Sequence, residues 1–209
     1  MTRPSRRLLL GLGVALLAVA VFSPLASWGE HRSFAAHMAQ HLLLGDLAPL
    51  VLAIALVAVA TVHPALAAAA WAINLVVWHV PVVYEAALHH ESVHLLQHVT
   101  LFTAGVLLWS AVVSQRWSVP ARLGAVAVMM LVSLGISSVL LWWPRVVYST
   151  YRYAHTLGGI SPLSDQRLGG GLMLIEGSLV AFAVAGWLIL QLLREQPLSA
   201  AAGDASPSP

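Results

Sequence analysis

This chain of 209 residues contains no cysteine and no lysine. Without cysteine it can form no disulfide bond, no thiolate zinc site and no thiol-based metal relay. Any transition metal that it binds must therefore be held by histidine, methionine, carboxylate or backbone oxygen ligands. All ten basic residues are arginine, and they are scattered over short segments. No polar surface with clustered basic charge is expected, which excludes a nucleic-acid-binding domain and leaves out nucleic acid as a partner.

Charged residues are also scarce, at 9% of the chain, whereas a soluble domain typically has about 25%. Hydrophobic residues make up 59% of the chain, and the mean hydropathy is +0.84. These values are typical of an integral membrane protein surrounded by a lipid bilayer. The apolar runs are long, continuous and rich in Leu, Ala and Val, which favours membrane-spanning helices over the alternating strands of a barrel.

Six apolar segments predict an all-α fold, a polytopic helical bundle that forms a single transmembrane domain over residues 1–195. The first segment is short and follows three arginines, as in a signal peptide, but no clear small-x-small cleavage site follows it. We therefore expect it to be retained as a helix. Residues 196–209 are mostly small, polar or proline, so a disordered tail is expected there. The spans are expected at about 8–22, 33–60, 64–78, 92–113, 122–141 and 168–193.

The distribution of arginine between the loops predicts the orientation of the bundle in the membrane. With the N-terminus inside, six arginines are cytoplasmic and four are external. Both termini then lie in the cytoplasm, with the protein in the plasma membrane. Nine of the ten histidines gather in the external third of the protein, and only His63 is cytoplasmic. The cytoplasmic arginines are Arg3, Arg6, Arg7, Arg116, Arg122 and Arg194, and the external ones are Arg32, Arg145, Arg152 and Arg167.

Two histidine pairs lie inside apolar segments, His37 with His41 and His94 with His98. Residues four apart on a helix are offset by about 40°, so each pair stands on one helix face. Histidine is costly in a membrane span unless it meets water, another polar group or a ligand. Imidazole is also the commonest side-chain ligand of transition metals, so these four residues form the predicted metal site. Hydrogen bonding between helices is the alternative.

Two neighbouring residues extend this prediction. Met38 lies beside His37, and a thioether next to imidazoles suits copper, especially Cu(I), which accepts soft ligands. Met38 points about 100° away from His37 around the helix, so joint ligation by the two is left open. His79 closes the third span on the same side of the membrane and is the next candidate ligand.

Two acids within the predicted spans, Asp46 and Glu176, are further functional candidates. A charged carboxylate at that depth costs several kcal/mol unless it is protonated, paired or hydrated, so either acid could meet a histidine or carry protons. Asp46 lies about half a turn around the helix from His37. This offset argues against a site shared by these two residues.

Two more candidates lie near the ends of spans. Tyr84 belongs to a short amphipathic stretch after the third span, and this stretch is expected to lie in the membrane interface. Asp165 precedes the sixth span and is expected to cap it, while Gly169 and Gly170 allow tight packing at its start. The alternative for Tyr84 and Asp165 is a purely structural role.

Two other functions remain open from the residues alone. A b-type haem protein would use histidines of the second and fourth spans as axial ligands, such as His41 and His98. A zinc metalloprotease would use residues 90–94, His-Glu-Ser-Val-His, which match the H-E-x-x-H pattern. That pattern needs both histidines on one helix, but Ser92 is expected to cap the fourth span, which would leave His90 outside it.

Four segments, in chain order, resemble the CtaG family of cytochrome c oxidase assembly factors, polytopic membrane proteins associated with aa- and caa-type oxidases. The resemblance implies a non-catalytic protein that helps to mature a haem-copper oxidase, by delivering or inserting copper at its copper B centre. Copper is then the implied metal, an oxidase subunit the implied partner, and an external copper donor a further one. The matching segments are HMAQHLLL (37–44), WHVPVVYEAAL (78–88), VHLLQH (93–98) and PLSDQRLGG (162–170).

The chain departs from the family pattern at two places. Gln97 stands where the family often has glutamate before the second histidine of the fourth span, so the carboxylate that could orient His98 is absent. After the paired glycines of the sixth span, Leu174 and Glu176 stand where the family commonly has tryptophan and proline.

Overall fold

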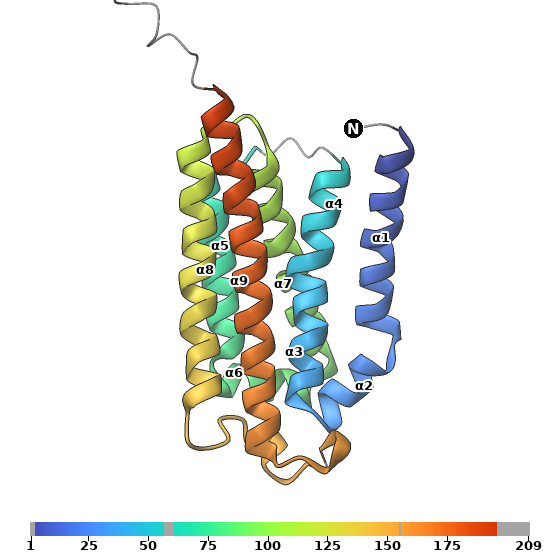
Figure 1. Cartoon of the computed structure of the whole chain (residues 1–209). Coiled ribbons are helices and arrows are strands. Elements are labelled where there is room, and N and C mark those ends of the chain that lie inside the picture. The colour runs from blue at the N-terminus through green and yellow to red at the C-terminus, as the bar shows by residue number, and fades with distance from the viewer. Residues whose placement is uncertain (1–2, 57–60, 155, 196–209) are drawn as a thin grey trace, which may run out of the picture.

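The computed structural model describes residues 3–56, 61–154 and 156–195. No strand occurs within these ranges, and the long helices stand side by side in a bundle (Figure 1), which confirms the predicted all-α fold. The predicted tail, residues 196–209, and one of the ten histidines, His155, lie outside the described residues. The elements are α1 (Arg3–Phe22), α2 (Pro24–His31), α3 (Phe34–Leu42), η1 (Leu43–Leu47), α4 (Ala48–Leu56), α5 (Pro64–His79), α6 (Pro81–His89), α7 (Glu91–Val113), α8 (Val119–Trp142), η2 (Ser149–Tyr153), η3 (Leu157–Gly159) and α9 (Pro162–Glu195).

The described helices include five runs that are long and apolar enough to cross a membrane, which confirms the helical membrane bundle. These runs are α1, the continuous α3–η1–α4 segment, α7, α8 and α9. The third predicted span differs, because the 16 residues of α5 extend only about 24 Å, less than the roughly 30 Å of a bilayer core. Together α5 and α6 pass the same test, with a bend of 73° between them.

The bend between α5 and α6 has a local cause. Pro81 opens α6, and a proline disfavours helical backbone angles in the residue before it. Val80 accordingly has φ −65° and ψ 125°, which is extended backbone. The third predicted span is therefore a helix that stops at His79 and turns sharply, and not a straight crossing.

Glycines allow the helices around the predicted site to approach closely, as the sequence indicates. A Cβ added to Gly105 of α7 would collide with the backbone carbonyl of Gly45 in η1. A Cβ on Gly169 would meet the Phe34 ring at 2.6 Å, and one on Gly170 would meet the backbone nitrogen of Leu141 at 2.9 Å. Because these residues have no side chain, α7 can lie directly against η1, and α9 directly against α3 and α8.

The bundle has two ends with different side chains. We call the end at which α3 and α7 begin the histidine end; α2, α6 and the connection from α8 to α9 lie there (Figure 1). We call the opposite end, which carries Arg116, Arg122 and Arg194, the arginine end. His63 caps the start of α5 at the arginine end, where its ring lies 4.9 Å from the Trp117 ring.

Two predicted helix starts are wrong. Ser92 does not cap α7, because the helix begins at Glu91 and His90 is the capping residue. The sixth span begins at Pro162 and not near Leu168, so Asp165 lies in its first turn. In both cases polar residues continue the helix beyond its apolar part, which hydrophobicity alone does not reveal.

Candidate functional site

The two histidine pairs face each other between α3 and α7. The ring of His37 lies 5.6 Å from that of His94, and the ring of His41 lies 5.7 Å from that of His98, centroid to centroid. Within each helix the two rings of a pair are 4.2 Å apart. We call these four residues the histidine cluster. The i, i+4 spacing puts each pair on one helix face. Both helices begin at the same end of the bundle, which brings the two faces together.

Hydrogen bonds fix the proton positions on the α3 pair. Burial raises the pKa of Tyr151 above its ordinary value, so this phenol stays protonated, and its hydroxyl donates to the Gly29 carbonyl at 2.6 Å. Its oxygen must then accept from Nδ1 of His37, 3.0 Å away. A neutral His37 with its proton on Nδ1 has a bare Nε2, which accepts from Nε2 of His41 at 2.8 Å.

The α7 pair borders a cleft of about 510 Å³ at the histidine end. Nδ1 of His94 lies 3.2 Å from a carboxylate oxygen of Glu30 in α2. The Nε2 atoms of His94 and His98 are buried and make no hydrogen bond to another described residue. A buried polar nitrogen without a partner is costly, so these two atoms are available to a ligand.

On its other side the histidine cluster adjoins a small internal cavity of about 40 Å³. His41 and His79 line this cavity together with Asp46 and Glu176. Nδ1 of His79 lies 2.8 Å from the Leu75 carbonyl, while its Nε2 is buried and has no hydrogen-bond partner among the described residues. Both carboxylate oxygens of Glu176 are likewise buried and make no hydrogen bond to another described residue. The cavity has room for a few water molecules, which such groups would bind.

Asp46 reaches this cavity through an irregularity in its helix. It lies in η1, a five-residue π-helical segment, and one Asp46 oxygen accepts from the Trp109 indole at 2.6 Å. The cavity brings Asp46 beside His41, while His37 does not line it. The prediction that Asp46 and His37 do not share a site agrees with this placement. Short π-helical segments are frequent at functional sites.

The stretch that carries Tyr84 was expected at the membrane interface, and within the protein the Tyr84 side chain is only 1% exposed. Its ring stacks on Tyr148 at 3.9 Å and lies 5.2 Å from His37. Its hydroxyl lies 3.3 Å from that of Tyr151. After the bend at Val80, α6 lies at the histidine end (Figure 1). Tyr84 there packs between Tyr148 and His37 and so supports the histidine cluster.

Asp165 was expected to cap its own helix, and this is also wrong. Its carboxylate instead accepts from the start of α3: from the Ser33 hydroxyl at 2.7 Å and from the Phe34 N–H at 2.6 Å. The first N–H groups of a helix have no partner within it, so Asp165 provides one from α9. It thereby fixes the beginning of the helix that carries His37 and His41.

Met38 does not join the histidine cluster. It packs in an apolar cluster with Phe34, Tyr148 and Met173 and lines the internal cavity.

In the protease pattern, His90 is the exposed, non-helical residue before α7, while His94 is buried in the helix. The two therefore lack the common helix face that the pattern requires. The facing rings of His41 and His98 are compatible with the haem alternative as well as with a metal site, so the haem alternative stays a prediction.

The histidine cluster would have to rearrange to hold a metal ion. No group of three or more His, Cys, Asp or Glu side chains in the described part of the chain is placed so that it could hold an ion as it stands. Two nitrogen ligands at about 2.05 Å from a tetrahedral metal would be about 3.3 Å apart, whereas Nε2 of His37 and of His41 are 2.8 Å apart. The chemistry of the donors fits copper, but the α3 pair has to open by about half an ångström.

Three residues that support the cluster were missed by sequence reasoning. Glu30 and Tyr151 lie outside the predicted spans, and Trp109 appears as an ordinary apolar residue of the fourth. Tyr148 and Tyr151, three residues apart in a connecting segment, are the one signal that could have been noticed. The hydrogen bond between Tyr151 and His37 depends on how that segment folds back over the histidine end, which no local pattern encodes.

Comparison with known proteins identifies the family. No curated protein and no solved structure matches the chain. The family model of the cytochrome c oxidase caa3 assembly factor matches it over residues 2–62 and 56–195, which includes both histidine pairs. Because the match extends over nearly all of the chain, the protein belongs to the family of cytochrome c oxidase caa3 assembly factors.

Proposed function

We propose that this assembly factor takes up a copper ion at the histidine cluster and passes it to an oxidase subunit during assembly. The observation that carries the proposal is the convergence of two histidine pairs, in which His37, His41 and His94 are buried and His98 is half-buried, with Nε2 of His94 and His98 lacking any partner among the described residues. Copper is the cargo here, and no turnover chemistry is proposed.

The donor set favours Cu(I) over harder ions. The cluster offers neutral imidazole nitrogens in a buried site, and Cu(I) accepts such ligands at low coordination number. When the ion binds, the proton on Nε2 of His41 has to leave that atom, and His41 can then carry its proton on Nδ1. Without copper, the hydrogen bond between Nε2 of His37 and Nε2 of His41 thus occupies both nitrogen atoms. A small separation of the two rings would break this bond and make both atoms available to the ion.

The cleft beside His94 and His98 gives the route for copper. Glu30 and Glu91 also line this cleft, and their carboxylates would attract a cation toward the histidines. The arginine distribution supports an external position of the histidine end. An external donor would then load copper through the cleft, and the oxidase subunit would receive it within the membrane.

Copper binding is testable on the detergent-purified protein. Cu(I) is titrated in competition with a chromophoric chelator, for the wild type and for His94→Gln/His98→Gln. The matched control is His31→Gln/His90→Gln, two exposed histidines of the same end that do not line the cleft. We expect one Cu(I) per chain in the wild type and in the control, and none in His94→Gln/His98→Gln. Equal binding by both double variants would overturn the proposal.

Delivery to the oxidase needs a second readout. Membranes from cells that carry each variant are assayed for the copper content and activity of the purified oxidase. We expect His94→Gln/His98→Gln to yield oxidase that contains haem but lacks copper, with the control variant normal. An oxidase with full copper in both variants would show that the cluster does not supply it.

A further inference from the structure

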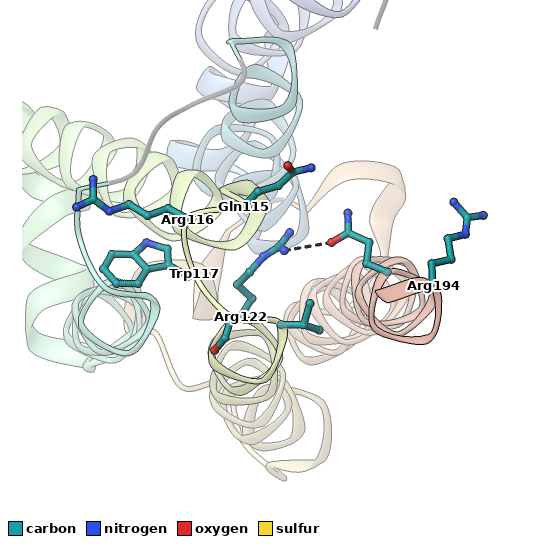
Figure 2. A pocket seen from close by; sticks show the side chains of 8 residues that line it. Gln115, Arg116, Trp117, Arg122 and Arg194 are labelled. Carbon is teal, nitrogen blue, oxygen red and sulfur yellow. Dashed lines mark hydrogen bonds between the residues drawn. The ribbon is translucent and has the colours of Figure 1, made fainter. Parts of the chain in front are cut away.

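A second cleft, unrelated to the histidine cluster, lies at the arginine end of the bundle. Its volume is about 490 Å³, and it lies between the connection of α7 to α8 and the last turns of α9. In Figure 2, Arg116 and Arg194 stand on opposite sides of the view, with Arg122 between them. We call this second cleft the arginine cleft. Its lining residues are Gln115, Arg116, Trp117, Ser118, Val119, Arg122, Gln191 and Arg194.

The side chains of the arginine cleft are suited to an anion. Three arginines line it, and no Asp or Glu does so among the described residues. The indole nitrogen of Trp117 is buried and makes no hydrogen bond to another described residue. An indole N–H can only donate, so this atom requires an acceptor. Together with the amides of Gln115 and Gln191, the cleft presents donors from several directions.

Arg122 shapes the cleft. Its side chain is 2% exposed, and its Nε donates to the Val112 carbonyl at the end of α7 at 2.5 Å. Its Nη1 donates to the Gln191 side chain at 3.1 Å, as the dashed line in Figure 2 shows. Arg122 therefore ties α7 to α9 and holds a positive charge beneath the cleft. Arg116 and Arg194 are exposed, and the Arg116 guanidinium lies 5.7 Å from the centre of the Trp117 ring.

The position of the cleft indicates where the anion comes from. The cleft lies at the ends of three membrane-spanning helices, α7, α8 and α9, which is the level of lipid headgroups. Beside the lining residues Gln191 and Arg194 on α9, the apolar side chains of Leu190 and Leu193 are exposed, at 55% and 60%. A phosphate in the cleft would leave acyl chains to lie along these residues. Basic pockets between membrane helices bind anionic lipid headgroups in this way.

We propose that the arginine cleft binds the phosphate headgroup of an anionic phospholipid, held by Arg116, Arg194 and the Trp117 indole above the buried Arg122. The bound lipid would join α7, α8 and α9 at the end of the bundle opposite to the histidine cluster. The site is independent of copper handling, since no residue is common to the two.

Native mass spectrometry of the detergent-purified full chain tests this binding. The protein is titrated with phosphatidylglycerol and, separately, with zwitterionic phosphatidylcholine. The test variants are Arg116→Gln/Arg194→Gln and Trp117→Phe, which keeps the ring and removes the donor. The matched control is Arg145→Gln/Arg152→Gln, which removes two exposed arginines at the histidine end. A third arm adds inorganic phosphate in excess to the phosphatidylglycerol complex.

We expect one phosphatidylglycerol bound in preference to phosphatidylcholine, unaffected in the control and weakened about 10-fold or more in Arg116→Gln/Arg194→Gln. Trp117→Phe should weaken it by a smaller factor, and inorganic phosphate should not displace it. Equal losses in both arginine double variants would mean general attraction by charge, and displacement by phosphate would mean a free-anion site. Either result, or equal binding of phosphatidylcholine, would overturn the proposal.

Discussion

The two ends of this bundle differ in how deeply their polar groups are placed. At the histidine end, four imidazoles pack between α3 and α7, with His37 fully buried. At the arginine end, Arg116 and Arg194 are exposed around an open cleft, and only Arg122 is buried, with backbone and side-chain partners. A neutral imidazole can be buried and still coordinate a cation, whereas a guanidinium always keeps its charge. The ligands of a cation site can therefore lie inside the bundle, whereas the two arginines that would reach an anion lie at its surface.

The largest effect is expected from Asp165→Ala, which would remove hydrogen bonds at the histidine end and leave the arginine end unchanged. The variant leaves the Phe34 N–H and the Ser33 hydroxyl buried without their acceptor. We expect a loss of about 2–4 kcal/mol in the free energy of unfolding, measured by denaturant unfolding in micelles, and a loss of copper binding.

The conservative variant Asp165→Asn serves as the control, because its amide oxygen can still accept one of these hydrogen bonds. It should lose less stability than Asp165→Ala. Wild-type stability in both variants would mean that Asp165 does not hold the start of α3.

A somewhat smaller effect is expected from Gly105→Ala, which lies between the two ends. The new methyl group would collide with the Gly45 carbonyl and push α7 away from η1. We expect a destabilisation of about 1–3 kcal/mol, as for overpacking in a core. Gly124→Ala is the matched control, since nothing lies within 4 Å of its added Cβ. If both variants unfold at the same temperature, the close packing of α7 on η1 is not important for stability.

Tyr151→Phe sharpens the comparison by removing the hydroxyl group that contacts His37. It removes the hydroxyl that links Nδ1 of His37 to the Gly29 carbonyl, so the ring loses its fixed orientation and proton position. We expect copper affinity to fall about 10-fold or more, as for other hydrogen-bond partners of metal ligands. The competition titration measures it, with exposed Tyr153→Phe as the control. Unchanged affinity would rule out this role of Tyr151.

The smallest effect is expected from Arg116→Gln/Arg194→Gln when copper is measured. The arginine cleft shares no residue with the histidine cluster, and both side chains are exposed. Copper affinity should equal that of the wild type, and stability in micelles should change by no more than about 0.5 kcal/mol. A weaker affinity for copper would show that the two ends are coupled.

Periodicity and apolar runs were sufficient to predict the long apolar helices and the histidine pairs, but not the starts of α7 and α9 or the bend after α5. The i, i+4 spacing of His37 with His41 sets a helix face whatever the surroundings, and the order of the spans brings α3 and α7 to the same end. The π-helical segment around Asp46 was not predictable, because LLGDL continues the same apolar pattern. The partner of Asp165, more than a hundred residues away, depends on the packing of α9 against α3. Tertiary contacts of this kind have no signature in the local sequence.

The most direct test of copper handling is X-ray absorption at the copper edge on the protein loaded with one Cu(I). We predict scattering from imidazole nitrogens alone, lost when His94→Gln/His98→Gln is treated in the same way. A sulfur ligand in the spectrum would contradict this, since it would place the ion near Met38 and Met173 in the internal cavity. An unchanged imidazole signal in the double variant would equally move the site away from the histidine cluster.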